Sequence, residues 1–81
     1  MWFVYIVECG DSTYYTGITT NLERRVHEHN HSKKGACYTS LRRPVKLVYY
    51  VKTENRIEAM KEELRIKKMS RKRKMTLINS K

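Results

Sequence analysis

The chain has 81 residues, with 18 Lys and Arg against eight Asp and Glu, and a formal net charge of +10. This length predicts a single domain over residues 1–81, because domains typically contain about 50 to 250 residues. The longest apolar run, residues 2–7, is far shorter than the roughly 20 residues of a membrane helix. Two cysteines are too few for a disulfide scaffold and no secretory signal opens the chain, so we expect a cytoplasmic protein without a membrane partner.

The positive charge is concentrated in the second half of the sequence. Residues 1–30 hold two basic and four acidic side chains, residues 31–51 hold five and none, and residues 52–81 hold eleven and four. This asymmetry indicates a polyanionic partner, most commonly nucleic acid, because basic side chains that neutralise phosphates release condensed counterions. A solvated, solubilising surface is the alternative interpretation, and a structural adaptor for an acidic protein is a third.

Two strands and a helix are predicted in the first half of the chain. Residues 2–7 are apolar on both alternating faces, which is typical of a central strand covered on both sides. Residues 10–12 have turn composition, and residues 13–19 predict the hairpin partner of the first strand. Thr20 and Glu23 have the spacing of a capping box, so a helix is expected from Asn21 to about Asn30.

One strand and two helices are predicted in the second half. Residues 31–44 predict a basic loop, and residues 45–51 predict a third strand. A helix is expected from about Glu54, and Ser70 is placed to cap a short final helix. The expected apolar stripe of the longer helix contains Ile57, Met60 and Leu64. The order strand, strand, helix, strand, helix, helix predicts an α/β (α+β) fold, with a small three-stranded sheet flanked by helices.

Three polar side chains lie where the patterns predict apolar neighbours. Arg25 shares a face of the first predicted helix with His29, and Glu63 lies at the margin of the packed face of the second. Tyr5 lies in the middle of the first strand, where a phenol needs a hydrogen-bond partner if it is buried. Each side chain alone is explained by a structural ion pair or by an edge position. Their convergence on one sheet favours a functional site.

The order and spacing of these residues resemble the signature of the GIY-YIG nuclease superfamily. In that family a strand carries Gly-Ile-Tyr, its hairpin partner carries Tyr-Ile-Gly, and an Arg follows on the first helix. Here residues 3–5 read Phe-Val-Tyr, residues 15–17 read Tyr-Thr-Gly, and Arg25 follows. Residues 59–63 resemble the segment that carries the single Glu of the family, with Glu63 at the matching position.

The resemblance covers essentially the whole chain, including the basic segments 33–36 and 42–49 that are similar to small stand-alone bacterial members. Two departures are visible. The first motif lacks its Gly, and Ile18 stands where some nuclease members carry a Lys that contacts phosphate.

The resemblance implies a metal-dependent endonuclease that hydrolyses phosphodiester bonds in DNA. Glu63 is the expected ligand of Mg²⁺ (or Mn²⁺), because such an ion takes one or two carboxylates and keeps several waters. Arg25 offers a permanently charged, planar fork for the scissile phosphate. The alternative is a non-catalytic nucleic-acid-binding module with a decayed nuclease site.

The resemblance also assigns roles to the remaining site residues. Tyr5 is the expected general base, although a phenol with a pKa of about 10 lies about 4 kcal/mol from ionisation at pH 7. Tyr15 is expected to position the water or the phosphate, and His29 to assist as a proton carrier. Gly17 is expected to allow a close backbone approach.

Basic side chains outside the motifs are the expected nucleic-acid contacts. They are Lys33, Lys34, Arg42, Arg43, Lys67, Lys68, Arg71 and Arg73. No segment resembles a base-reading helix, so we expect the shape of DNA or another structured nucleic acid to set specificity, as in DNA repair or recombination. No larger protein partner is identifiable from the sequence.

Histidines near the end of the first predicted helix provide a weaker signal. His27 and His31 are four residues apart, a spacing that brings side chains together on a helix. Asn30 ends the predicted helix, however, and no third ligand is evident. The sequence therefore does not predict a histidine metal site.

Overall fold

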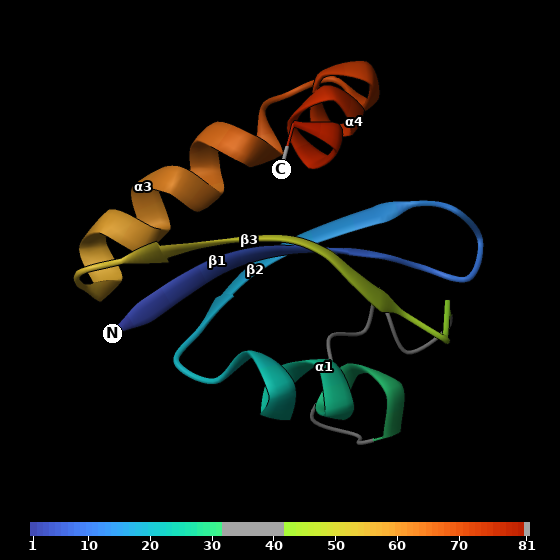
Figure 1. Ribbon diagram of the computed structural model, residues 1–81, viewed down its shortest axis with the longest axis horizontal. Helices are drawn as coiled ribbons and strands as arrows, with labels where there is room; N and C mark the ends of the chain where they lie inside the picture. Colours follow the sequence, from blue (N-terminus) through green and yellow to red (C-terminus); the bar gives the residue numbers. More distant parts are fainter. Residues whose placement is uncertain (32–41, 81) are drawn as a thin grey trace.

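The computed structural model describes residues 1–31 and 42–80, which form a three-stranded sheet with helices on both faces. The elements are β1 (Trp2–Glu8), β2 (Tyr14–Thr19), α1 (Leu22–His31), β3 (Lys46–Thr53), α3 (Arg56–Lys67) and α4 (Arg71–Asn79). Helix α1 covers one face of the sheet, and α3 and α4 lie on the other (Figure 1). The predicted element order and α+β class are confirmed. No helix in this described part of the chain is long and apolar enough to cross a bilayer.

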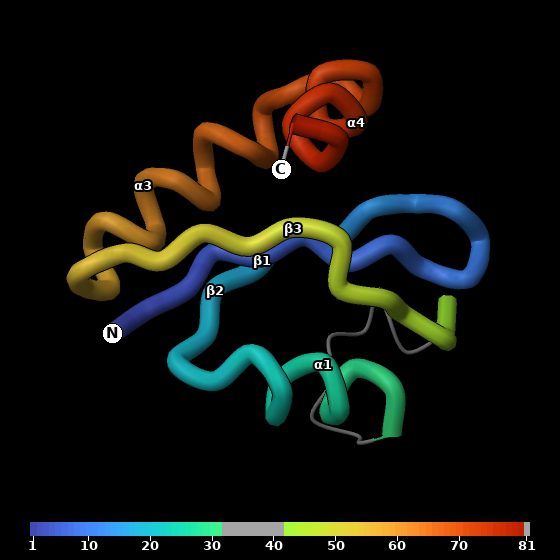
Figure 2. Tube along the Cα trace, viewed as in Figure 1, coloured from blue at the N-terminus to red at the C-terminus, as the bar shows by residue number. Residues whose placement is uncertain are grey.

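Strand β1 is the central strand of an antiparallel sheet with the order β2-β1-β3. Alternate side chains of β1 enter two separate cores, which explains why this segment is apolar at every position. Val4 and Ile6 belong to the cluster that contains Ala59 and Ile66 of α3. Tyr5 and Val7 belong to the other cluster, on the α1 face, where Leu22 and Val26 of α1 pack. The tube in Figure 2 shows these two layers on either side of the sheet.

The entry to β3 is held against α1 by one asparagine. The Asn30 amide donates from Nδ2 to the Val45 carbonyl at 3.1 Å, and its Oδ1 accepts from the Val45 backbone N–H at 2.7 Å. This paired contact satisfies both backbone groups of Val45 at a point where no neighbouring strand does so. It fixes the last turn of α1 relative to the sheet.

The residue that caps the N-terminus of α1 is not the predicted one. Asn21 Oδ1 accepts from the Arg24 N–H at 3.0 Å, so Asn21 occupies the N-cap and the predicted capping box of Thr20 and Glu23 is wrong by one residue. The backbone N–H of Asn21 is bound to Thr19 Oγ1 at 3.1 Å, which fixes the turn out of β2. Helix α1 also continues to His31, one residue beyond the expected end.

The packed face of α3 is also different from the predicted apolar stripe. Ala59 and Ile66 are fully buried, whereas Ile57, Met60 and Leu64 are 66%, 48% and 55% exposed. The prediction of the stripe is wrong because the small Ala59 side chain faces the sheet and turns the bulkier residues toward solvent. Helix α3 begins after the N-cap Asn55, and the Ser70 cap predicted for α4 is confirmed by its 3.2 Å contact with the Arg73 N–H.

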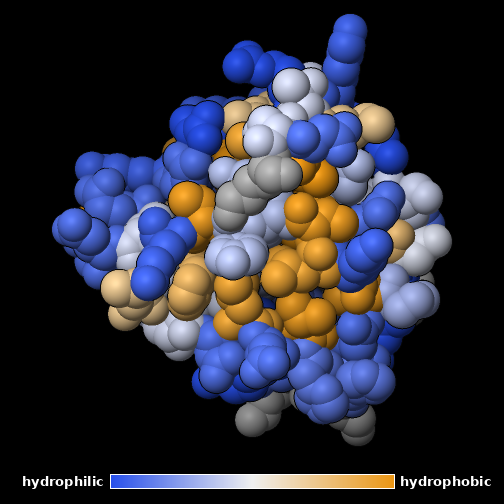
Figure 3. Space-filling view, in the orientation of Figure 1, coloured by the Kyte–Doolittle hydropathy of each residue, from blue (hydrophilic) through white to orange (hydrophobic). Residues whose placement is uncertain are grey.

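Part of the apolar surface remains uncovered around edge strand β3. In Figure 3, which has the orientation of Figure 1, apolar side chains gather near the middle of the face and hydrophilic groups surround them. Val48 and Val51 of β3 are half-buried against the core. This face of the molecule therefore has a largely polar rim around a small apolar centre.

Candidate active site

Tyr5 and Gly17 lie opposite each other in the β1–β2 pair. A Cβ atom placed on Gly17 would lie 2.6 Å from Tyr5 Oη and 2.8 Å from Cζ, so the phenol occupies the space that any other residue would fill. Glycine is thus required here by the Tyr5 side chain. The prediction from the sequence was that Gly17 allows a close approach of the backbone. In the structure, the group that comes close to Gly17 is the Tyr5 phenol.

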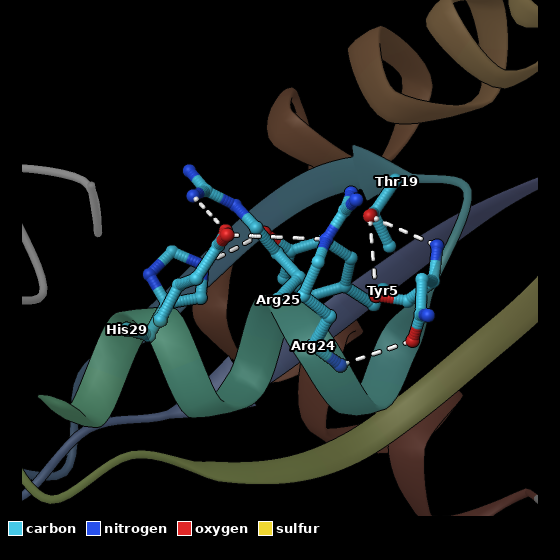
Figure 4. Close-up of polar contacts among 7 residues, drawn as sticks. Tyr5, Thr19, Arg24, Arg25 and His29 are labelled. Atoms are coloured by element: carbon cyan, nitrogen blue, oxygen red, sulfur yellow. Dashed lines mark hydrogen bonds and ion pairs between the residues drawn. The ribbon is translucent and has the colours of Figure 1, made fainter. Parts of the chain in front are cut away.

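Helix α1 brings Arg25 and His29 to the same phenol. The two residues are one turn apart on the face of α1 that covers Tyr5 (Figure 4). His29 is fully buried, and its Nε2 lies 2.7 Å from Tyr5 Oη. The Arg25 guanidinium also makes a hydrogen bond to Tyr5. Because a guanidinium only donates, the phenol oxygen accepts from Arg25. When the imidazole proton is on Nδ1, the phenol donates its own proton to His29 Nε2.

Tyr15 completes an aromatic and polar cluster on this face of the sheet. Its ring lies edge-on to the His29 imidazole, with the ring centroids 5.3 Å apart. The structure thus places four of the residues singled out in the sequence together: Tyr5, Tyr15, Arg25 and His29.

Burial keeps the central pair of this cluster uncharged at neutral pH. Desolvation raises the pKa of Tyr5 to about 12, and the neighbouring Arg25 guanidinium offsets only part of that rise. Desolvation, together with the positive charge of Arg25, lowers the pKa of His29 to about 4. Tyr5 is therefore a neutral phenol and His29 a neutral imidazole at pH 7.

Glu28 holds Arg25 in place and was not singled out in the sequence. Its Oε1 lies 3.0 Å from Arg25 Nη1, and both side chains are about one-quarter exposed or less. The spacing of three residues on a helix was the available signal, since such pairs face each other. This ion pair leaves the Arg25 guanidinium bridging from α1 to the phenol in the sheet.

Glu63 lies in a different layer from these four residues. It is on α3, which packs on the opposite face of the sheet from α1 (Figure 1). Its carboxylate lies 3.3 Å from Lys67 Nζ, and its side chain is 23% exposed. The Glu63 charge contributes to the raised pKa of Tyr5, so the carboxylate is within electrostatic reach of the phenol. The structure records no direct contact between Glu63 and the α1 cluster.

The arginines expected to contact nucleic acid before β3 have intramolecular partners. Arg42 Nε lies 3.0 Å from a carboxylate oxygen of Asp11, and both side chains are at least one-third exposed. Arg43 donates from Nε to the backbone carbonyl of His29. Arg43 therefore ties the β3 entry to the last turn of α1. Lys33 and Lys34 lie outside the described residues.

The other expected contacts form a basic surface where α3 turns into α4. Lys67, Lys68, Arg71 and Arg73 are all exposed here. Lys68 and Arg73 line a shallow groove together with Arg65 and Ser70. The Arg71 guanidinium lies over the ring of Tyr14, 4.9 Å from its centroid. This contact connects the basic surface to β2, the strand that carries Tyr15 and Gly17.

Comparisons with known proteins agree with this arrangement. Residues 1–76 match the family model of the GIY-YIG catalytic domain, so the chain belongs to the GIY-YIG nuclease family. It is 58% identical to a UPF0213 protein of Desulfotalea psychrophila, over 98% of this chain and 72% of that protein. It is 53% identical to a UPF0213 protein of Syntrophus aciditrophicus, over 94% of this chain and 87% of that protein.

A solved structure shows the same fold. The solution NMR structure of a UPF0213 protein from Bacillus halodurans has a TM-score of 0.64 and 43% sequence identity to this chain. The match covers 100% of this chain and 86% of that one. The resemblance drawn from the sequence to the GIY-YIG family, and to its small bacterial members, is confirmed.

Proposed function

We propose that this protein is a metal-dependent endonuclease that hydrolyses phosphodiester bonds in DNA and selects its substrate by shape. The observation that carries the proposal is the hydrogen-bonded set of Tyr5, His29 and Arg25 beside Gly17, in a chain that belongs to a nuclease family. GIY-YIG nucleases act on DNA, and the +10 net charge suits a polyanionic substrate.

Tyr5 cannot hold a resident negative charge as a simple base. With a pKa of about 12, its phenolate at pH 7 costs about 7 kcal/mol, which is more than the roughly 4 kcal/mol of a free phenol. We infer instead that Tyr5 relays a proton. The attacking water gives its proton to the phenol oxygen as the phenol gives its own proton to His29 Nε2.

A bound phosphate would prepare His29 for this role. The pKa of His29 is low partly because Arg25 and Arg43 place positive charge near it. A phosphodiester held by Arg25 neutralises some of that charge, so His29 becomes a stronger base only when substrate is present. Arg25 would therefore bind the substrate, and its neutralisation by the phosphate would raise the pKa of His29.

Glu63 is the proposed ligand for Mg²⁺ (or Mn²⁺). Its only ion-pair partner in the described part of the chain, Lys67, is half-exposed, and such a pair contributes little, so the carboxylate is able to exchange Lys67 for a divalent ion. A single carboxylate fits an ion that retains most of its water shell and takes a phosphate oxygen. When bound, the ion would offset negative charge that develops on the phosphate.

The proposed substrate path crosses the edge strand β2. Gly17 carries no side chain, Tyr15 flanks it on the α1 side, and the contact between Arg71 and Tyr14 brings the basic α4 surface to the same strand. A backbone lying along this edge would reach both layers of the protein. Lys67, Lys68, Arg71, Arg73 and Arg42 are the proposed phosphate contacts. Contacts of this kind read shape and backbone rather than base sequence.

A paired substitution on α3 tests the proposal. Glu63→Gln removes the proposed metal ligand, whereas Glu62→Gln alters the adjacent carboxylate, which is bound bidentately to Arg65. Cleavage of linear, nicked, flapped and branched DNA, and of RNA, is measured with Mg²⁺, Mn²⁺ or a chelator. We expect the wild type and Glu62→Gln to nick branched or flapped DNA, and Glu63→Gln to bind it without cutting.

The main alternative is a non-catalytic nucleic-acid-binding module. The observation that favours it is the position of Glu63 on α3, which packs on the opposite face of the sheet from α1, together with the burial of Tyr5. If the wild type and Glu63→Gln leave every substrate intact while binding it equally, this alternative replaces the nuclease proposal.

A further inference from the structure

Two histidines lie side by side on the solvent-facing side of α1. Because α1 continues to His31, His27 and His31 are one turn apart on the same helix. Both side chains are exposed, and their ring centroids lie 4.6 Å apart with an interplanar angle of 38°. They line the rim of an open groove between α1 and β3 whose apolar residues include Val26 and Leu47.

The 4.6 Å distance between the ring centroids of His27 and His31 is close to that of two imidazoles bound to one metal ion. Zinc–nitrogen bonds are 2.0–2.1 Å long, so two imidazoles on one tetrahedral ion have ring centroids about 5 Å apart. The observed ring separation is therefore compatible with a shared ion. Histidines four residues apart on a helix are also the spacing used by zinc-binding helices.

We propose that His27 and His31 form a binding site for a transition-metal ion that prefers imidazole nitrogen, with Zn²⁺ as the representative ion. Mg²⁺ does not suit this pair because it prefers oxygen ligands. The site uses other side chains than the proposed nuclease centre: His27 and His31 are exposed on α1, whereas His29 of the same helix is buried against Tyr5 and Glu63 lies on α3.

The number of protein ligands determines how tightly the site binds a metal ion. Within residues 1–31 and 42–80, no group of three or more His, Cys, Asp and Glu side chains is arranged to hold a metal. The described part of the chain would therefore supply two imidazoles, and water would fill other positions of the ion. Affinity is expected to be lower than that of a closed structural zinc site with four protein ligands.

The location of the pair gives metal binding a structural consequence. A cation in the last turn of a helix interacts favourably with the negative end of the helix dipole. An ion shared by His27 and His31 also links consecutive turns. The same helix carries Arg25 and His29, so the ion would stabilise the element that supports the Tyr5 cluster, because binding to the folded state alone raises stability.

Zinc titration of the untagged chain tests this inference. Calorimetry measures stoichiometry and affinity, and NMR of the histidine rings identifies the ligands. We expect one Zn²⁺ per chain, selective shifts of the His27 and His31 rings, and a higher unfolding temperature. His27→Gln and His31→Gln should each weaken binding by roughly tenfold or more. Mg²⁺ at equal concentration should not shift these rings.

A thiol control separates this site from adventitious binding. Cys37→Ser removes a second class of zinc ligand, and we expect it to bind Zn²⁺ as the wild type does. The inference is overturned if both histidine variants bind Zn²⁺ with wild-type affinity, or if Cys37→Ser alone abolishes binding. Because the readouts are affinity and ring shifts, neither result depends on nuclease activity.

Discussion

Acidification should destabilise this protein through His29. The folded-state pKa of His29 is about 4, below its value of 6.5 in the unfolded chain, so between these values the unfolded chain binds more protons. Stability is therefore lost as the pH falls through this window. From pH 7.5 to pH 5 the expected loss is about 2 kcal/mol, and it approaches about 3 kcal/mol at pH 4. This is a large share of the roughly 4–12 kcal/mol expected for 81 residues.

Urea unfolding at several pH values, followed by circular dichroism, measures this effect. The range from pH 7.5 to 5 avoids most carboxylate titration, because hydrogen bonds lower the pKa of both Asp11 and Glu62. His29→Gln removes the buried imidazole and should lose much less stability over this range. His27→Gln changes an exposed histidine of the same helix and should behave as the wild type does.

Two results would refute the reasoning. One is a His29→Gln variant that loses as much stability as the wild type between pH 7.5 and 5. The other needs no substitution: an NMR titration of the wild-type ring in which His29 protonates near pH 6.5 instead of near 4. Either result would mean that the imidazole is not held neutral by burial.

Three further substitutions test the site and its supports. Gly17→Ala places a methyl group 2.6 Å from Tyr5 Oη, so we expect a loss of about 1–3 kcal/mol in urea unfolding and no nicking; an unchanged midpoint contradicts this. Tyr5→Phe leaves the buried Nε2 of His29 without its partner and should cost about 1–3 kcal/mol with nicking abolished, whereas retained nicking excludes the relay. Asn21→Ala removes the α1 cap and should cost about 1 kcal/mol without changing DNA binding, and equal stability would argue against the cap.

The proposed proton relay and the proposed Mg²⁺ ligand lie in different layers of the protein. On the α1 face the proposed proton relay uses Tyr5 and His29, which are fully or almost fully buried. On the α3 face the proposed metal ligand is Glu63, which is part-exposed and, among residues 1–31 and 42–80, is ion-paired only with a half-exposed Lys67. In the proposed mechanism a substrate at the β2 edge connects these layers. The paired Glu63→Gln and Glu62→Gln test addresses this connection directly.

The sequence alone determined the element order, the hairpin and the family. Residues 2–7 are apolar on both faces because β1 is covered by a helix layer on each side, and that pattern is visible without coordinates. The Ser70 cap was likewise predictable, because capping depends on a few neighbouring residues. The family could be identified from the spacing of four residues, Tyr5, Tyr15, Gly17 and Arg25, because this spacing fixes their positions along two paired strands and one helix.

Tertiary packing decided which face of α3 is buried and how the site residues ionise, which local sequence patterns could not. Ala59 faces the sheet instead of Ile57, because the fit between α3 and the strands determines which side of the helix is buried. The pKa values of Tyr5 and His29 depend on desolvation and on Arg25, which are properties of groups brought together from separate parts of the chain. The placement of Glu63 across the sheet has the same origin. Periodicity describes one element at a time, whereas burial and electrostatics depend on which elements meet.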